Sequence, residues 1–175
     1  LQRYYDTPLP DPTTELAQAS LVALDLETTG LDARHDAIVS VGLLPFDLQR
    51  VRTSQARYWV VKPDTELAAE SVTFHHLTHS DLAEAPPLSH ILAQLLDALA
   101  GKVAVVHYRP IEREFLDRAA RRLLGAPLRF PVLDTMQIEA RAQRTSTNRF
   151  LNWVRGDRQL SLRLGDSRRR YRLPA

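Results

Sequence analysis

Cysteine is absent from the 175-residue sequence, and only two of its 23 basic residues are lysine. Without thiols the chain has no disulfide framework, thiolate metal site or cysteine nucleophile, so zinc chemistry is disfavoured. Long hydrophobic runs are missing too, because the apolar stretches fall well short of the roughly 20 residues that span a bilayer. The N-terminus lacks the basic and then apolar layout of a signal peptide. The sequence therefore predicts a cytoplasmic protein without a membrane partner.

Size and composition are those of one globular domain. Hydrophobic residues make up 44% of the chain and charged residues 25%, close to the globular average. Residues 1–20 contain Pro8, Pro10 and Pro12 and show little periodicity, which predicts an extended N-terminal leader. We expect the folded domain to occupy residues 21–175.

Charge is divided unevenly along the chain. Residues 1–100 hold 6 basic and 14 acidic residues, a net charge of −8, whereas residues 101–175 hold 17 and 7, a net charge of +10. The basic residues are almost all arginine, whose planar guanidinium pairs well with phosphate. The pattern is compatible with a basic face that meets a polyanion beside an acidic site, and equally with an ordinary solvated, arginine-rich surface.

Hydrophobic periodicity predicts three strands in a meander followed by strands that alternate with helices. Leu88–Ala100 has its leucines on one helical stripe, and Gly101 suits the position just after the helix. Strands are predicted at 21–26, 38–46, 55–61, 103–106 and 132–134, helices at 88–100, 110–124 and 135–142, and a further amphipathic segment at 160–171. This order implies an α/β fold with a mixed sheet covered by helices.

Two acidic residues mark the end of the first strand. Side chains two apart in a strand share a face, so Asp25 and Glu27 project together while Leu24 and Leu26 face the other way. Neighbouring carboxylates repel one another, and a divalent metal bound by oxygen ligands keeps both ionised. The pair predicts a metal site, although paired acids are also common at solvated strand ends.

The longer pattern resembles the DEDD superfamily of 3′-to-5′ exonucleases, which includes the epsilon subunit of bacterial DNA polymerase III and RNase T. The likeness runs from about Leu21 to Pro174. A second motif of the superfamily, typically His-Asn-x-x-Phe-Asp, corresponds to His107-Tyr108-Arg109-Pro110-Ile111-Glu112, with Tyr108 in place of Asn and Glu112 in place of Asp. The segments that carry the likeness are Asp25-Leu26-Glu27-Thr28-Thr29-Gly30-Leu31, Asp36-Ala37-Ile38-Val39-Ser40-Val41-Gly42 and Phe74-His75-His76-Leu77-Thr78.

The resemblance implies a ribonuclease H-like mixed five-stranded sheet with helices on both faces. It implies two Mg²⁺ or Mn²⁺ ions held by Asp25, Glu27 and Glu112, and hydrolysis that releases nucleoside monophosphates from single-stranded 3′ ends of DNA or RNA. Around the terminal nucleotide it implies contacts from Thr28, Thr29, Gly30, Leu31 and His75. It also allows a DNA polymerase or another domain as a partner.

The superfamily's third motif, His-x-x-x-x-Asp or Tyr-x-x-x-Asp, has no counterpart in the sequence. The last histidine is His107, and no aspartate follows Tyr171. We therefore expect the domain to lack its C-terminal third-motif helix here, with a general-base histidine and a fourth metal carboxylate beyond Ala175.

Three other functions remain open at this stage. A nucleic-acid-binding module with the same fold and no catalysis would account for Glu112 and for the missing third motif. A proofreading subunit associated with a polymerase is a second alternative. A phosphatase or another two-carboxylate metal enzyme is the third, and it explains the Thr28-Thr29-Gly30-Leu31 sequence poorly.

Overall fold

The computed structural model describes residues 1–64, 77–144 and 161–173. The chain divides into two compact units, Leu1–Leu133 and Asp134–Ala175. The exonuclease domain of residues 21–175 stays a prediction. Each unit is described by itself. No helix in the described ranges combines the length and the apolar character needed to cross a membrane.

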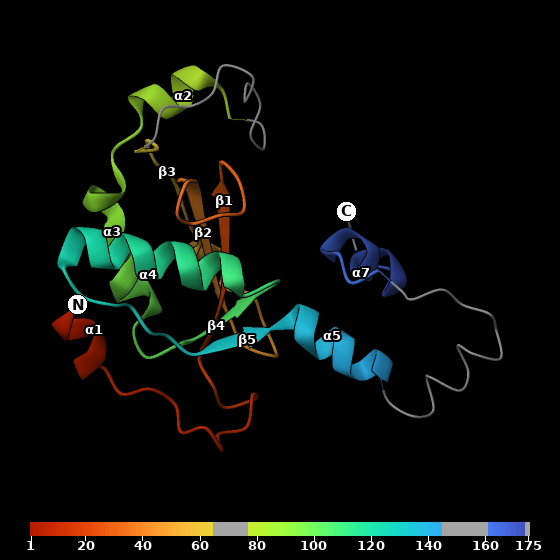
Figure 1. Ribbon diagram of the computed structural model, residues 1–175. Coiled ribbons are helices and arrows are strands. Elements are labelled where there is room, and N and C mark those ends of the chain that lie inside the picture. Colours follow the sequence, from red (N-terminus) through yellow and green to blue (C-terminus); the bar gives the residue numbers. More distant parts are fainter. Residues whose placement is uncertain (65–76, 145–160, 174–175) are drawn as a thin grey trace. The chain divides into compact units, whose positions relative to one another are not determined.

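A five-stranded mixed sheet organises the fold (Figure 1). Its spatial order is β3-β2-β1-β4-β5; β1 and β2 pair antiparallel, as do β2 and β3, whereas β4 runs parallel to β1. The strands are β1 (Leu21–Thr28), β2 (Ile38–Phe46), β3 (Arg57–Val60), β4 (Val103–Val106) and β5 (Val132–Asp134). The structure thus confirms the predicted mixed α/β sheet. The prediction of helices on both of its faces is tested for one face only.

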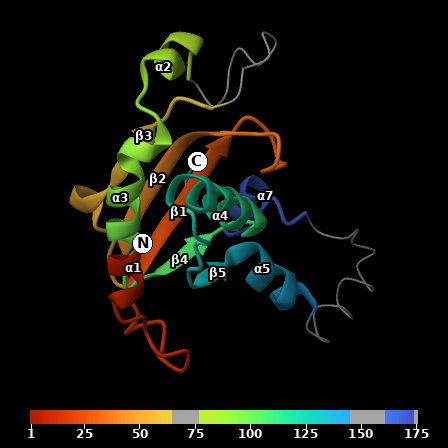
Figure 2. The same cartoon turned by 60° about the vertical axis from the view of Figure 1, so that its left-hand side comes forward.

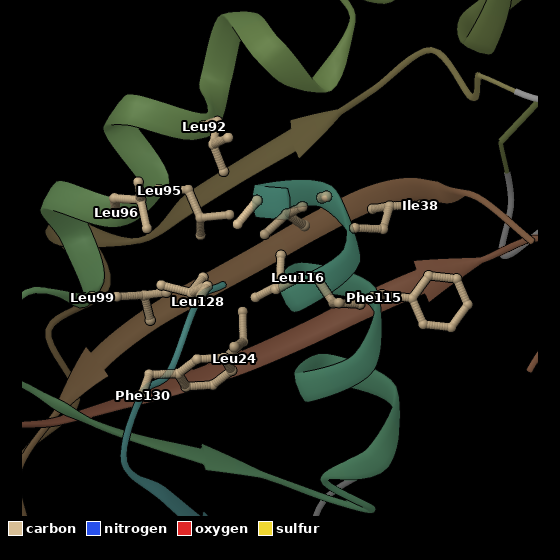
Figure 3. Close-up of a cluster of buried hydrophobic side chains, with 14 of the residues drawn as sticks. Leu24, Ile38, Leu92, Leu95, Leu96, Leu99, Phe115, Leu116, Leu128 and Phe130 are labelled. Atoms are coloured by element: carbon tan, nitrogen blue, oxygen red, sulfur yellow. The ribbon is translucent and has the colours of Figure 1, made fainter. Parts of the chain in front are cut away.

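One face of the sheet is covered by two helices, α3 (Leu88–Leu99) and α4 (Pro110–Leu124). Pro110 suits the first turn of α4 because its missing N–H would have no helical partner there, and Gly125, at φ 70°, ends the helix in the left-handed region. Figure 3 shows the resulting core, in which leucines of α3 meet residues of α4 and of β1. The labelled buried side chains are Leu24, Ile38, Leu92, Leu95, Leu96, Leu99, Phe115, Leu116, Leu128 and Phe130.

The first residues differ from the predicted extended leader. Gln2–Asp6 form a short helix, α1, which lies beside α3 (Figure 2). Tyr4 is only 4% exposed and belongs to the hydrophobic core, and Arg3 lies 3.4 Å from Asp97 of α3. Two further short elements were also not predicted, the 3₁₀ helix η1 (Thr53–Gln55) and the helix α2 (His79–Glu84).

The second unit contains α5 (Thr135–Arg144) and α7 (Leu164–Arg170). The backbone N–H of Met136 donates to Asp134 Oδ1 at 3.0 Å, so this aspartate caps the start of α5. Glu139 of α5 accepts from Tyr171 Oη at 2.6 Å and pairs with Arg170 of α7. These bonds tie the two helices together.

Candidate metal and nucleic-acid site

The end of β1 presents two carboxylates on the face away from the α3–α4 core. Leu24 and Leu26 are 2% and 6% exposed, whereas Asp25 is exposed and Glu27 is partly exposed. This alternation confirms that the two acids share one face. The β1–β2 register shifts between Glu27 and Thr28. A bulge of this kind bends a strand and redirects its side chains, and such bulges are common beside active sites.

The third predicted ligand, Glu112, comes from the neighbouring strand–helix junction. The parallel pairing Val22↔Ala104 and Ala23↔Val105 places the carboxyl ends of β1 and β4 side by side. Glu112 follows in the first turn of α4, a helix that contacts β1, and its side chain is only 3% exposed. A negative charge near a helix N-terminus is favoured by the helix dipole. All three predicted ligands therefore belong to elements that meet at this edge of the sheet.

The three carboxylates fit a hard divalent cation in their chemistry, because Mg²⁺ and Mn²⁺ prefer oxygen donors. Among the residues described by the structure, no group of three or more His, Cys, Asp or Glu side chains has a spacing that could hold a metal ion. Carboxylates that approach one another without a cation repel, which favours side-chain positions that keep them apart. A shared metal site of Asp25, Glu27 and Glu112 therefore stays a prediction.

The loop after β1 is built around Asp36, a residue whose role the sequence analysis did not identify. Its carboxylate accepts from Thr29 Oγ1 at 3.1 Å and from the backbone N–H of Asp32 at 2.9 Å. Thr29 Oγ1 in turn accepts from the N–H of Ala37 at 2.9 Å. A Cβ on Gly30 would lie 2.4 Å from Asp36 Oδ2, so only glycine leaves room for this arrangement. In the sequence, the signal that could have identified this loop was a threonine directly before Gly30 and seven residues before an aspartate, Thr29 and Asp36.

The residues predicted to touch the terminal nucleotide have different surroundings. Thr28 Oγ1 donates to the carbonyl of Gly30 at 2.6 Å, so both threonine hydroxyls hydrogen-bond within the loop. Leu31 is 79% exposed, and its contact with a base stays a prediction. His75 lies outside the described residues.

Tyr108 sits in the turn between β4 and α4 with φ 82°, a left-handed conformation that bulky residues rarely adopt. The asparagine typical of the second motif tolerates this region of backbone space far better. Tyr108, a residue that is 46% exposed, therefore has a backbone conformation that is strained for an aromatic residue.

Two arginines of the run Arg168–Arg170, near the end of the sequence, form ion pairs within the second unit. Arg169 pairs with Asp166, and Arg170 pairs with Glu139 and donates to the carbonyl of Ser161 at 2.8 Å. These pairs hold the second unit together, so this stretch is not simply a free basic surface.

Comparison with solved structures defines the class of fold. The chain superposes on E. coli Exonuclease I in complex with a dT13 oligonucleotide with a TM-score of 0.63, at 13% identity, over 74% of this chain and 31% of that one. Exonuclease X in complex with 5′ overhanging duplex DNA gives a TM-score of 0.55, at 18% identity, over 78% and 73%. At these identities the likeness shows the exonuclease fold alone.

The family follows from sequence. The RNase T exonuclease family model matches residues 22–161, and the chain belongs to this family. The DNA polymerase III epsilon subunit of Treponema pallidum is 29% identical over 66% of this chain and 53% of its own length. An epsilon-like protein of Rhodobacter capsulatus is 30% identical over 73% of this chain. A PolC-type DNA polymerase III of Thermotoga maritima is 26% identical over 74% of this chain. The chain spans 18% and 9% of these last two proteins.

Proposed function

We propose that this chain is a metal-dependent 3′-to-5′ exonuclease domain that releases nucleoside monophosphates from single-stranded 3′ ends of DNA or RNA. The observation that carries the proposal is the shared face of Asp25 and Glu27 at the end of β1. This strand is contacted by α4, which carries Glu112 in its first turn. Membership of the exonuclease family supports it.

Asp25, Glu27 and Glu112 would hold two Mg²⁺ or Mn²⁺ ions, which when bound supply an activated water and charge stabilisation at the leaving 3′ oxygen. The chain's own contribution is positioning. Leu31 would pack on the terminal base, and the Thr28–Gly30 backbone would contact the sugar and phosphate. His75 is proposed as a further contact to that nucleotide.

Cleavage of an oligonucleotide labelled at its 5′ end tests the proposal. With Mn²⁺ we expect a ladder that shortens from the 3′ end, and we expect EDTA or Glu27→Ala to abolish it because each removes metal binding. Gln18→Ala, a change on the surface at the opposite end of the sheet, is the control and should cleave normally. Undiminished cleavage by Glu27→Ala would refute the metal site.

A second candidate is a nucleic-acid-binding module that has lost the reaction. Glu112 in place of the usual Asp favours it. Oligonucleotide binding that is unaffected by EDTA, without any cleavage in Mn²⁺, would support this function in place of the exonuclease.

Association with a DNA polymerase is also proposed, because several relatives are named as parts of DNA polymerase III. The chain, tagged and purified from cells, should bring a polymerase with it, and a mock purification without the chain should not. This tests the partnership separately from catalysis.

A further inference from the structure

A cleft of about 340 Å³ lies between α4 and the segment that leads into β5. Its floor is apolar and is formed by Pro110, Leu128 and Phe130. The charged residues that line it are three arginines and two acidic residues, Arg109, Arg113, Arg129, Glu114 and Asp117. The volume falls within the range of ordinary ligand sites, and an apolar floor with a few charged groups is the usual lining of such sites.

The wall of the cleft that carries Arg129 is fixed by hydrogen bonds from three directions. Asp117 Oδ1 accepts from the N–H of Leu128 at 3.0 Å. Tyr5 Oη accepts from the N–H of Arg129 at 2.8 Å, and Arg113 Nη2 donates to the carbonyl of Phe130 at 3.4 Å. The cleft is thus held open by contacts from α1 and α4, rather than being a gap beside a loose loop.

The charge of the cleft is positive once its internal pairs are considered. Asp117 forms a 2.8 Å bond with Arg121 Nε. Burial alone would raise the pKa of Asp117, but the bonds from Arg121 and Leu128 hold it below its usual value, so this carboxylate is charged and already balanced within the protein. Arg113 and Arg129 then face a single further carboxylate of the lining, that of Glu114.

The start of α4 carries residues of both the cleft and the candidate metal site. Arg109, the N-cap residue, and Arg113 line the cleft, and Glu112, a predicted metal ligand, lies between them in the sequence. With its 3′ end at Glu112, a strand would bring a preceding phosphate to these arginines.

We propose that this cleft binds a backbone phosphate of the single-stranded nucleic acid on the 5′ side of the scissile bond. The inference rests on the proposed function for the position of the 3′ end. Arginine provides forked donors to phosphate oxygens, and the apolar floor accepts the flat face of the adjoining base. The site would favour strands of several nucleotides over a dinucleotide or a free phosphate.

The test compares Arg113→Gln/Arg129→Gln with the unchanged 175-residue chain in binding labelled oligo-dT of twelve nucleotides, measured by fluorescence anisotropy in EDTA. We expect the double variant to bind about tenfold more weakly, because charged hydrogen bonds to phosphate are lost. The slope of log affinity against log salt should fall by about 0.7 for each phosphate contact removed. Arg50→Gln removes one charge near the opposite end of β1 and should change neither quantity.

Shorter ligands identify which phosphate the cleft binds. Inorganic phosphate, thymidine monophosphate and dT2 should bind the double variant and the unchanged chain alike. A defect as large for inorganic phosphate as for the longer strand would overturn the assignment to a strand phosphate, as would equal affinities for the longer strand. Because binding is measured without cleavage, failure of the exonuclease assay and failure of this inference are separate results.

Discussion

At the scale of the residue, Gly30 is where the packing of the candidate site leaves least room. Asp36 is held by Thr29 and by the N–H of Asp32, and a Cβ on Gly30 would lie 2.4 Å from its Oδ2. We expect Gly30→Ala to lower the free energy of unfolding by about 1 to 3 kcal/mol, as overpacking does, and to reduce cleavage. Urea denaturation measures the first effect.

Gly42→Ala is the matched control, because a Cβ there meets its nearest atom, the carbonyl oxygen of Asp25, at an ordinary 3.8 Å. If Gly30→Ala were as stable and as active as this control, the Asp36 arrangement would not be what orders the loop.

The backbone conformation of Tyr108 predicts how a substitution there changes the free energy of unfolding. A left-handed conformation costs an ordinary residue about 1 to 2 kcal/mol, and asparagine pays much less of it. Tyr108 has φ 82° and is 46% exposed, so Tyr108→Asn relieves the backbone and gives up only part of the burial of a core residue. We expect it to raise the free energy of unfolding by about 1 kcal/mol.

Tyr58→Asn provides the comparison for Tyr108. Tyr58 is 61% exposed but lies in β3, where asparagine is a poor strand former, so that change should lower stability. Destabilisation by both changes would show that the φ of Tyr108 is not under strain.

At the scale of the element, the link between α5 and α7 should depend on pH. Burial alone would raise the pKa of Glu139, but bonds from Tyr171 and Gln143 together with Arg170 lower it below its usual value. A carboxyl whose folded pKa is depressed stabilises the fold above its unfolded pKa, and this contribution is lost as pH falls through the folded value. We therefore expect the α5–α7 contact to weaken below about pH 4.

Glu139→Gln removes this charge and nearly preserves the shape of the side chain. Denaturant unfolding measures the free energy of unfolding of both chains between pH 7 and pH 3. We expect this free energy to fall less for the variant than for the unchanged chain. Glu84→Gln, on the exposed surface of α2, should behave as the unchanged chain does. Parallel pH curves for all three chains would argue against the contribution of Glu139.

Elements with strong local signals were predicted closely. The leucine stripe of α3, the Pro110 and Gly125 boundaries of α4 and the apolar start of β1 are each visible in a short stretch of consecutive residues. Helix α2 was missed although it has a signal, since Thr78 and Asp81 form a capping box, with Asp81 Oδ2 accepting from the N–H of Thr78 at 2.8 Å. An aspartate at the position where glutamate or glutamine is usual made it inconspicuous.

At the scale of the whole molecule, the contacts that the sequence did not predict join residues far apart in the chain. Tyr5 Oη donates to the carbonyl of Pro127 at 3.1 Å and accepts from the N–H of Arg129 at 2.8 Å. No periodicity or motif links positions 122 or 124 residues apart. The same limit applies to the arginine cleft, whose lining comes from separate segments, and to the approach of α4 to β1, which depends on the parallel pairing of β4 with β1.

Tyr4 shows what this long-range packing contributes. Its side chain is 4% exposed in the core, and its buried hydroxyl has no hydrogen-bond partner within the described part of the chain. Burial, with a smaller effect of Tyr5, raises the pKa of Tyr4 to about 12. The folded state disfavours the charged tyrosinate. The contribution of Tyr4 to the free energy of unfolding is therefore fully present below the unfolded pKa, near 10, and is lost as pH rises from there towards 12.

Two substitutions at this position separate the ring from its hydroxyl. Tyr4→Ala should cost about 3 to 5 kcal/mol in the free energy of unfolding, as the loss of a buried aromatic ring does. Tyr4→Phe should be neutral or stabilising at pH 7, because it removes a buried polar atom that gains no bond, and it should lose less stability than the unchanged chain between pH 9 and pH 11. Denaturant unfolding at these pH values measures both effects. A Tyr4→Ala variant as stable as the unchanged chain would mean that α1 is not docked on α3, and that the N-terminal residues are the extended leader which the prolines alone suggest.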